Sequence, residues 1–345
     1  MGRRRTKRPA RHHRGEGLTL TLQRHAGRRL RPGASVSAAP HHEAHVLLDP
    51  RAHTITSSRR CLATVTLGGT LVEKLRATAL AHFEGVELAQ SDLEASSVTA
   101  TDVYHLARDL GLAVNVLQPL RDVESLPDSD YVRGCDRACR MLDTASELGA
   151  ETMLVCSNTS TLAIDDPDRA AGQLHHLADL AAERGLQIGF EALSWGTVIK
   201  TQRAAWDVVS RAPHPNLGLV VDSFHACALN EDTSFLETVP SHRLLMVQLA
   251  DAPAVQGDLM RWSRRMRCFP GDGVFDIVSF LRHVLSSGYR GPVSLEVFSD
   301  HLKTLPPIEC ARRAMASLAR LEHTASTVPR VAPFGALCPQ DEHPL

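Results

Sequence analysis

The chain has 345 residues and a mass of 37.6 kDa, with 43% hydrophobic and 22% charged residues. These values are typical of a globular protein and exclude a collagen-like or wholly disordered chain. No apolar run approaches the roughly 18 residues of a membrane-spanning helix, so we expect no membrane span. The eight cysteines form no Cys-x-x-Cys pair, which is typical of a reducing compartment. No signal-peptide core follows the basic residues 3–14, and we expect a cytoplasmic protein.

The formal net charge of −1 conceals a basic head on an acidic body. Residues 1–60 contain 14 Lys and Arg residues and three acidic ones, whereas the rest contains 24 basic and 36 acidic residues. Because the head has little apolar surface to offset the loss of chain entropy, residues 1–60 are predicted to be a disordered extension. The alternative is a nucleic-acid arm, which we do not favour because no aromatic residue interleaves the charges.

From residue 61 onward, short apolar runs alternate with amphipathic segments. Strands are predicted at 62–67, 85–88, 113–117, 152–155, 188–190, 217–221, 244–247 and 293–295. Helices are predicted at 70–82, 99–110, 131–148, 168–184, 202–211, 275–286 and 308–321. Continuous apolar strands between helices indicate a parallel sheet that is buried on both faces.

Eight such units predict a (β/α)8 TIM barrel over residues 61–323, followed by a loose tail at 324–345. The runner-up is a doubly wound open sheet. That fold would place a Gly-x-Gly-x-x-Gly fingerprint after an early strand, and the sequence has none there.

Four consecutive predicted strands end in a side chain that carries oxygen: Glu191, Asp222, Gln248 and Glu296. The carboxyl ends of barrel strands form the functional face, so these side chains are expected to converge. Three carboxylates packed together repel one another and do not all ionise without a cation. The oxygen set favours a hard divalent ion such as Mg²⁺ or Mn²⁺. The alternative is a ring of salt bridges to Arg or Lys in the barrel mouth.

Further polar residues follow the predicted strands. His225 lies three residues after Asp222 and is a candidate general acid or base, with a helix-capping histidine as the alternative. Arg121 and Arg267 are candidates to clamp a substrate carboxylate, with surface arginines as the alternative. Residues 261–273 are predicted to form a long loop that shapes the pocket.

Several segments together are similar to a known family. They are LQPLRD (117–122), CSN (156–158), FEALSWG (190–196), DSFH (222–225), VQLADAP (247–253), WSRRMRCFPGDG (262–273) and GYRGPVSLEVFSD (288–300). Between about residues 62 and 321, the chain resembles the bacterial 3-dehydroshikimate dehydratases, which belong to the xylose-isomerase-like barrels.

The resemblance implies a role for each matched position. It gives the metal ligands as Glu191, Asp222, Gln248 and Glu296, the four residues that the strand ends had indicated independently. It makes His225 the acid/base group, with metal-linked Glu191 as the other candidate for removing the first proton. It also implies four substrate-binding residues: Arg121, Ser263, Arg267 and Glu87.

The implied reaction converts 3-dehydroshikimate to protocatechuate and water. An enolate forms beside the ketone with the help of a divalent cation (Mg, Mn or Co), and the β-hydroxyl then leaves. Many bacterial members carry a second, dioxygenase-like domain after the barrel. A chain that ends at residue 345 has no room for one, and we expect dehydration to be intact without it.

Other functions stay open from the sequence. A sugar isomerase or epimerase, or an inosose dehydratase, would use the same barrel, but two arginines facing the pocket favour a carboxylated substrate. A DNA-repair nuclease would need a histidine-rich rim, which most predicted strand ends lack. A non-enzymatic alternative is a basic arm that binds nucleic acid on a barrel scaffold. We expect a small-molecule substrate, no membrane and no nucleic-acid partner, and a homo-oligomer stays open.

Overall fold

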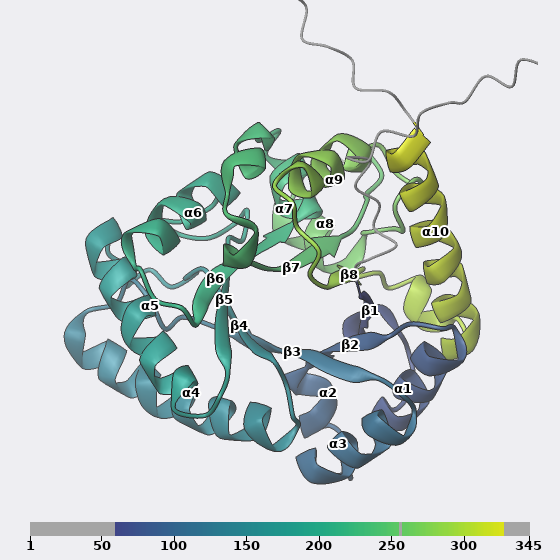
Figure 1. Cartoon of the computed structure of the whole chain (residues 1–345), viewed down its shortest axis with the longest axis horizontal. Helices are drawn as coiled ribbons and strands as arrows, with labels where there is room; N and C mark the ends of the chain where they lie inside the picture. Colours follow the sequence, from purple (N-terminus) through teal and green to yellow (C-terminus); the bar gives the residue numbers. More distant parts are fainter. Residues whose placement is uncertain (1–58, 255–256, 328–345) are drawn as a thin grey trace, which may run out of the picture. The chain divides into compact units, whose positions relative to one another are not determined.

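Eight parallel strands close into a barrel in the order β1 to β8, and the helices surround it (Figure 1). The computed structural model describes residues 59–254 and 257–327. The predicted (β/α)8 barrel is therefore confirmed. The predicted extension at 1–60 lies outside the described residues, apart from Arg59 and Arg60, and so does the tail from 328 onward. Within the described part of the chain, no helix combines the length and the apolar character of a membrane span.

The elements follow the predicted order closely. The strands are β1 (Arg60–Ala63), β2 (Gly85–Ala89), β3 (Ala113–Leu120), β4 (Thr152–Cys156), β5 (Gln187–Glu191), β6 (Leu217–Asp222), β7 (Leu244–Leu249) and β8 (Val293–Leu295). The α-helices are α1 (Leu71–Leu80), α2 (Gln90–Glu94), α3 (Ala100–Asp109), α4 (Asp128–Glu147), α5 (Pro167–Ala182), α6 (Gln202–Arg211), α7 (Ser223–Ala228), α8 (Leu259–Arg265), α9 (Ile277–Ser286) and α10 (Pro307–Thr327). Short 3₁₀ helices are η2 (Thr64–Thr66), η3 (Ser234–Thr238), η4 (Ser241–Arg243) and η5 (Leu302–Thr304).

The first strand differs from its prediction. It starts at Arg60 and ends at Ala63, and η2 replaces the rest of the strand expected at 62–67. In this turn the hydroxyls of Thr64 and Thr66 bond to the backbone of the two neighbouring strands, β2 and β8. Thr64 Oγ1 accepts from Ala89 N at 3.0 Å, and Thr66 Oγ1 donates to Leu295 O at 3.2 Å.

Two segments near the C-terminus also differ. The long loop expected at 261–273 contains helix α8, which Asp258 caps by accepting from Met260 N. Helix α10 continues through residue 327, so residues 324–327, which were expected to belong to the tail, are helical. Its last turns are held by Glu322, whose carboxylate accepts from Arg60 Nε at 2.9 Å and Nη2 at 2.6 Å. This bidentate pair joins the end of the barrel to its first strand.

Alternate residues of each strand point into the barrel, because successive side chains of a strand face opposite ways. A deep apolar layer includes Val116, Leu154, Val220 and Met246, which pack together. Polar side chains stand two residues further along several of these strands, as with Asp222 after Val220. Intervening residues such as Phe190 pack into the larger core shared with the helices. The apolar layer therefore forms the floor beneath a polar layer at the strand ends.

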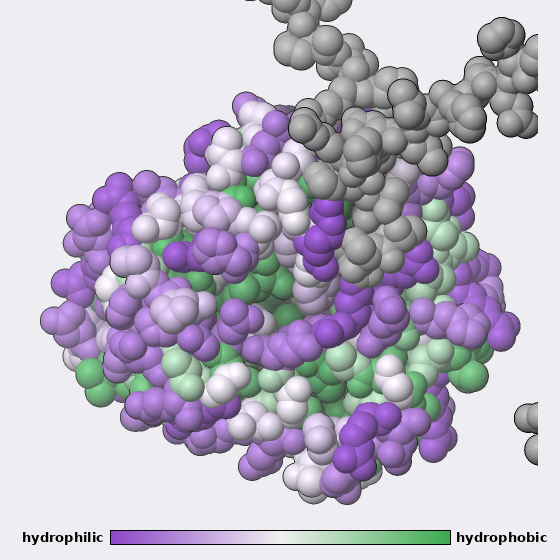
Figure 2. Space-filling view, viewed as in Figure 1, coloured by the Kyte–Doolittle hydropathy of each residue, from purple (hydrophilic) through white to green (hydrophobic). Residues whose placement is uncertain are grey.

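The outer surface in this view is mostly hydrophilic, and hydrophobic residues show in the central hollow and in places along the lower edge (Figure 2). The amphipathic helices account for this distribution, since each buries one face against the strands. Sharp helix starts help to place them. Thr70 and Thr99 each form a capping box, with Glu73 and Asp102 as the respective reciprocal partners.

The apolar floor gives a stability prediction. Leu154→Ala removes a fully buried side chain from the barrel interior, and it should lower the free energy of unfolding by about 2–5 kcal/mol. Leu162→Ala makes the same change at a leucine that is 53% exposed, and it should change that free energy by less than about 0.5 kcal/mol. Urea denaturation of both variants checks this, and equal losses would contradict the assignment of Leu154 to the core.

Candidate active site

A buried polar layer lies at the carboxyl ends of the strands. It contains the four predicted ligands together with Glu87 and Gln118, all of which are buried: Glu87, Gln118, Glu191, Asp222, Gln248 and Glu296. The strand register explains why they meet, because Asp222 on β6 is the ladder partner of Gln248 on β7. The convergence expected from the sequence is therefore present in the structure.

Two amides link the carboxylates on one side of this layer. Gln118 Nε2 donates to Glu296 Oε1 at 2.8 Å and to Glu87 Oε1 at 3.2 Å. Gln248 Nε2 donates to the same Glu87 oxygen at 2.5 Å. Gln118 was missed because the strand predicted from the sequence stops at Leu117, whereas β3 continues to Leu120.

Arg267 occupies the centre of the layer and is almost fully buried. Its Nη1 donates to Asp222 Oδ2 at 2.7 Å and to Glu296 Oε2 at 3.0 Å. Its Nη2 donates to Ser263 Oγ at 2.9 Å, and its Nε donates to Ser263 O at the same distance. The salt-bridge alternative raised from the sequence is thus partly present, because one guanidinium joins two of the four predicted ligands.

His225 is held on both sides of its ring. It stands on α7, whose N-cap is Asp222. Nδ1 accepts from Ser194 N at 3.2 Å and lies 3.0 Å from Ser194 Oγ. Nε2 lies 3.6 Å from Glu191 Oε1, 3.5 Å from Asp222 Oδ2 and 3.3 Å from Arg267 Nη2. Because Nδ1 accepts from the fixed backbone N–H of Ser194, the neutral ring carries its proton on Nε2, the nitrogen that faces the carboxylates of Glu191 and Asp222.

Burial shapes the electrostatics of the layer. It raises the pKa of Glu87 to about 8 and that of Glu296 to about 7, and the charge of Glu296 adds to the shift of Glu87. It raises the pKa of Glu191 well above the ordinary range, with the charges of Glu296 and Asp222 adding to the effect. It lowers the pKa of His225 well below its usual value, and the charges of Arg267, Arg121 and Arg264 lower it further. The layer thus carries more potential negative charge than Arg267 alone balances.

The donors at this position fit a divalent cation. Glu191, Asp222 and His225 each offer a ligand atom, and the three atoms lie within 4.8 Å of one another. In addition, Gln248 Oε1 is buried and has no hydrogen-bond partner among the described residues. Several buried acids and an unpartnered amide oxygen are the arrangement that a hard cation stabilises.

The structure brings the predicted ligands together in two ways. Glu191 and Asp222 share the three-residue group with His225, which was predicted as an acid/base residue rather than a ligand. Glu296 joins the group through Arg267, and Gln248 lies beside it through Glu87. A further neighbour, the Cys156 thiol, donates to Glu191 Oε2 at 3.3 Å.

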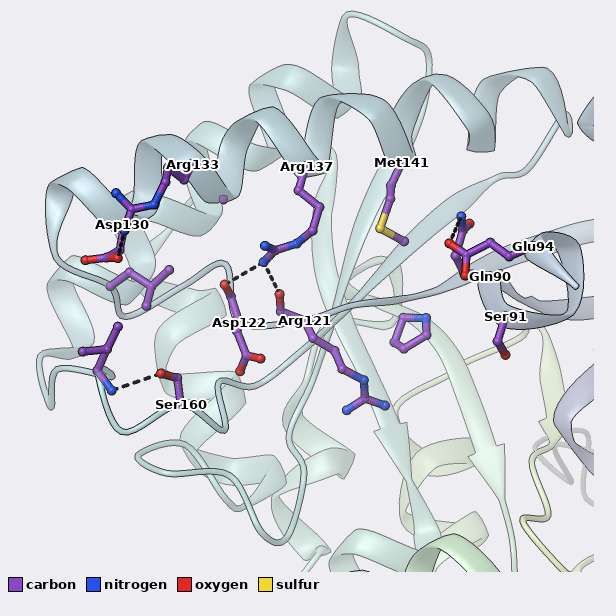
Figure 3. A pocket seen from close by; sticks show the side chains of 14 residues that line it. Gln90, Ser91, Glu94, Arg121, Asp122, Asp130, Arg133, Arg137, Met141 and Ser160 are labelled. Atoms are coloured by element: carbon purple, nitrogen blue, oxygen red, sulfur yellow. Dashed lines mark hydrogen bonds and ion pairs between the residues drawn. The ribbon is translucent and has the colours of Figure 1, made fainter.

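Arg121 lies apart from the hydrogen-bonded layer. It lines a cavity of about 580 Å³ between the end of β3, α2 and α4 (Figure 3). Arg137 Nη2 donates to the carbonyl oxygens of Arg121 and Asp122, at 2.6 and 3.0 Å. The Arg121 guanidinium points away from Arg137 (Figure 3). Of the predicted substrate-binding residues, Glu87, Ser263 and Arg267 thus belong to the buried layer, while Arg121 stands at its edge.

A further buried carboxyl group, that of Glu124, lies outside the layer and anchors the loops beside the site. Glu124 Oε1 accepts from Asn158 N at 2.7 Å, and Asn158 Nδ2 donates to the Glu124 carbonyl at 2.6 Å. These bonds join the segment after β3 to the segment after β4. Burial outweighs the hydrogen bond from Asn158 and raises the pKa of Glu124 to about 7. Nothing in the sequence pattern marked this residue, because its partner is 34 positions away.

Comparison with known proteins gives a consistent set of relatives. Residues 75–321 match the family model described as xylose isomerase-like TIM barrel. The 3-dehydroshikimate dehydratase of Pseudomonas aeruginosa is 44% identical over 279 residues, covering 79% of this chain and 44% of that protein. The protein of the same name from Pseudomonas putida is 42% identical over 264 residues, covering 76% and 42%. The chain thus spans less than half the length of either curated relative.

A solved structure agrees with these matches. It is described as a xylose isomerase-like TIM barrel/4-hydroxyphenylpyruvate dioxygenase fusion protein, and it superposes with a TM-score of 0.74 at 39% identity. The superposition covers 81% of this chain and 46% of the other. The likeness therefore extends over most of the present chain and about half of the fusion protein.

The cation site gives a binding prediction. Glu191→Gln replaces one carboxyl group of the candidate cation site by an amide, and it should weaken Mn²⁺ binding at least about tenfold, because even residues that only support a ligand change metal affinity by that factor. Isothermal titration calorimetry on metal-stripped protein measures the change. The fold should persist, since burial already disfavours the charged form of Glu191. The matched control is Glu183→Gln, at a side chain 69% exposed, and equal affinities in the two variants would contradict the assignment.

The raised pKa of Glu124 predicts a pH dependence of stability. The unfolded chain binds this proton with an ordinary pKa of 4.5 and the folded chain with a pKa of about 7. The contribution is therefore fully present below pH 4.5 and is lost as the pH rises through 7. Glu124→Gln does not titrate, so its stability relative to the unchanged protein should rise by up to about 3 kcal/mol from pH 5 to pH 8. Denaturation of both proteins across this range checks it, and a constant difference would contradict it.

Proposed function

Because this chain belongs to the xylose isomerase-like TIM barrel family, we propose that it is a metal-dependent 3-dehydroshikimate dehydratase, a hydro-lyase that forms protocatechuate and water. The observation that carries the proposal is the 44% and 42% identity to relatives named for that activity, over 79% and 76% of this chain. The buried carboxylates and histidine at the barrel mouth supply acid/base groups and cation ligands that such a reaction needs.

The proposed cation ligands are Glu191, Asp222, Gln248 and Glu296, with Mg²⁺, Mn²⁺ or Co²⁺ as the ion. When bound, the ion supplies a Lewis acid that polarises the substrate ketone. The Gln248 amide oxygen supports this role, because it is buried and has no hydrogen-bond partner among the described residues. Asp222 and Glu296 share Arg267 in this structure, so ion and guanidinium compete for the same carboxylate oxygens.

The proposed proton-transfer residues are His225 and Glu191. His225 Nε2 and Glu191 Oε1 lie 3.6 Å apart, so the two groups can act on the same part of a bound substrate. Burial keeps His225 neutral by lowering its pKa, and a neutral imidazole can accept the proton from the carbon beside the ketone. One of the two groups then returns a proton to the departing hydroxyl, which leaves as water. Loss of water and tautomerisation complete the aromatic ring.

The proposed substrate contacts are Ser263, Arg267, Glu87 and Arg121. The first three face the buried layer and offer hydrogen bonds to the ring oxygens of the substrate. The Trp195 ring meets the His225 ring edge to face, with centroids 4.8 Å apart, and it adds an apolar wall. These contacts orient the substrate before any proton moves, which is a large part of the rate enhancement in such sites.

We further infer a cytoplasmic enzyme with a role in aromatic catabolism through protocatechuate, as in degradation of quinate and shikimate. The seven cysteines of the described residues are free thiols, as expected in a reducing compartment. The substrate is a small molecule.

Turnover tests the proposal directly. Metal-stripped protein incubated with 3-dehydroshikimate should form no protocatechuate, and Mg²⁺, Mn²⁺ or Co²⁺ should restore its formation, followed by ultraviolet absorbance. His225→Asn should lower kcat by roughly 10²–10⁴-fold, the usual contribution of a general acid or base. Ketose sugars serve as control substrates for the isomerase alternative. Metal-loaded protein that turns over a sugar but not 3-dehydroshikimate would refute the proposal.

A further inference from the structure

The positive charge of Arg267 is already paired with carboxylates of the protein, so it is not available to a substrate carboxylate. Its two η nitrogens already bond to Asp222, Glu296 and the Ser263 hydroxyl, and its Nε bonds to the Ser263 carbonyl. The residue as a whole is also only 2% exposed. A carboxylate brought to it would meet two carboxylates of the protein first. The anionic end of the substrate therefore needs a different partner.

Arg264 is an arginine of the barrel mouth whose guanidinium has no hydrogen bond or ion pair among the described residues. It stands on α8 directly after Ser263, and its guanidinium carbon lies 4.4 Å from the centroid of the Phe298 ring. A cation over an aromatic face is held in place without losing its hydrogen-bond donors. Arg264 also stays exposed to solvent, so a ligand can reach it.

The ring beneath Arg264 belongs to the mouth of the barrel. Phe298 follows β8 and packs with Ala63 and Ala89, at the ends of β1 and β2. Helix α8 is fixed to this place because Arg267 N donates to Phe298 O at 3.0 Å and Met266 pairs with Ser299 in a β-bridge. Arg264 is therefore a pre-positioned cation rather than a loose surface side chain.

The Phe298 ring also ties Arg264 to the buried layer, because the Arg267 guanidinium carbon lies 5.3 Å from the same ring centroid. Arg121 follows the end of β3, and its guanidinium likewise has no hydrogen-bond or ion-pair partner among the residues the structure describes. The two charges act on each other and on the site. Although the residue is exposed, stacking on Phe298 removes part of the guanidinium from water, and this loss of water and then the charge of Arg121 lower the pKa of Arg264. Beyond burial, the charges of Arg267, Arg121 and Arg264 lower the pKa of His225. Two unpaired like charges at one mouth repel, and an anion between them removes that repulsion.

We propose that Arg264, acting with Arg121, binds the carboxylate of the substrate at the barrel mouth, while Arg267 contacts only its uncharged oxygens. The inference rests on the proposed dehydratase function and adds a specificity-determining residue to it. A carboxylate held at the rim leaves the ketone and hydroxyls to point inward, toward Glu191, Asp222 and His225. The pair would thereby select carboxylated rings over neutral ones.

Kinetics and binding on the metal-loaded full chain test this. Arg264→Ala should raise KM for 3-dehydroshikimate about tenfold to a hundredfold, the usual effect of losing a charged hydrogen bond, with kcat changed less than about threefold. The KM of Arg264→Lys should lie between that of the unchanged protein and that of Arg264→Ala. The matched control is Arg265→Ala, which removes the same charge from the next residue of α8, where the guanidinium faces Asp300 at 3.6 Å. Its KM should equal that of the unchanged protein.

Binding of two ligands that differ only in a carboxylate distinguishes loss of carboxylate recognition from a general disturbance of the site. Protocatechuate and catechol present the same two hydroxyls, and only protocatechuate has a carboxylate. By calorimetry, Arg264→Ala should weaken protocatechuate about tenfold or more and leave catechol unchanged. Equal weakening of both ligands, or a KM equal to that of Arg265→Ala, overturns the inference. Absence of turnover in the unchanged protein would instead refute the proposed function, and the ligand pair still tests the arginine.

Discussion

Four carboxyl groups and one guanidinium share a single buried layer at the carboxyl ends of the strands, and the rest of the site follows from that imbalance. Removing a carboxylate from water is costly unless hydrogen bonds and an opposite charge compensate. Arg267 compensates Asp222 and Glu296 directly. Glu87 relies on the amides of Gln118 and Gln248, and Glu191 on the Cys156 thiol. A further positive charge is therefore favoured here.

The barrel produces this crowding through register rather than through any local motif. Parallel strands in a closed barrel end at one level, and alternate residues face inward. Cys156 pairs with Glu191, Asp222 with Gln248, and Gln248 with Ser294. These steps carry polar side chains from β4 to β5 and from β6 through β7 to β8, whereas Glu191 is itself the ladder partner of Val220 on β6. The apolar layer of Leu154 and its neighbours below it excludes water and keeps the carboxyl groups in a medium of low dielectric constant.

Much of this arrangement could be predicted from the sequence because the signal is local. An apolar run that turns polar marks a strand end in the barrel, and Glu191, Asp222 and Glu296 each stand at such a point. The elements themselves were predictable for the same reason, and β8 and α6 have the predicted bounds. Threonine caps mark where helices begin, and the spacing of apolar residues distinguishes helices from strands.

The contacts between distant segments were not predictable in this way. Arg267 meets Asp222 and Glu296 across 45 and 29 positions, and the segment that carries it contains a helix where a loop was expected. Arg264 stands among other arginines in the sequence, and its contact with Phe298 appears only in the folded chain, where Arg267 lies over the same ring. Gln118 could be predicted as a site residue only if the end of β3 had been placed at Leu120 rather than at Leu117. These side chains contribute to the charge balance of the barrel mouth, and their partners are set by tertiary packing alone.

The central claim is that this layer binds one divalent cation between Glu191 and Asp222. Anomalous diffraction from a crystal soaked in Mn²⁺ tests it most directly, because the signal locates the ion without reference to activity. The account predicts one strong peak in contact with both carboxylates, with the bond from Arg267 to Asp222 loosened. A map with no peak there, and with Arg267 still joining Asp222 to Glu296, would contradict it.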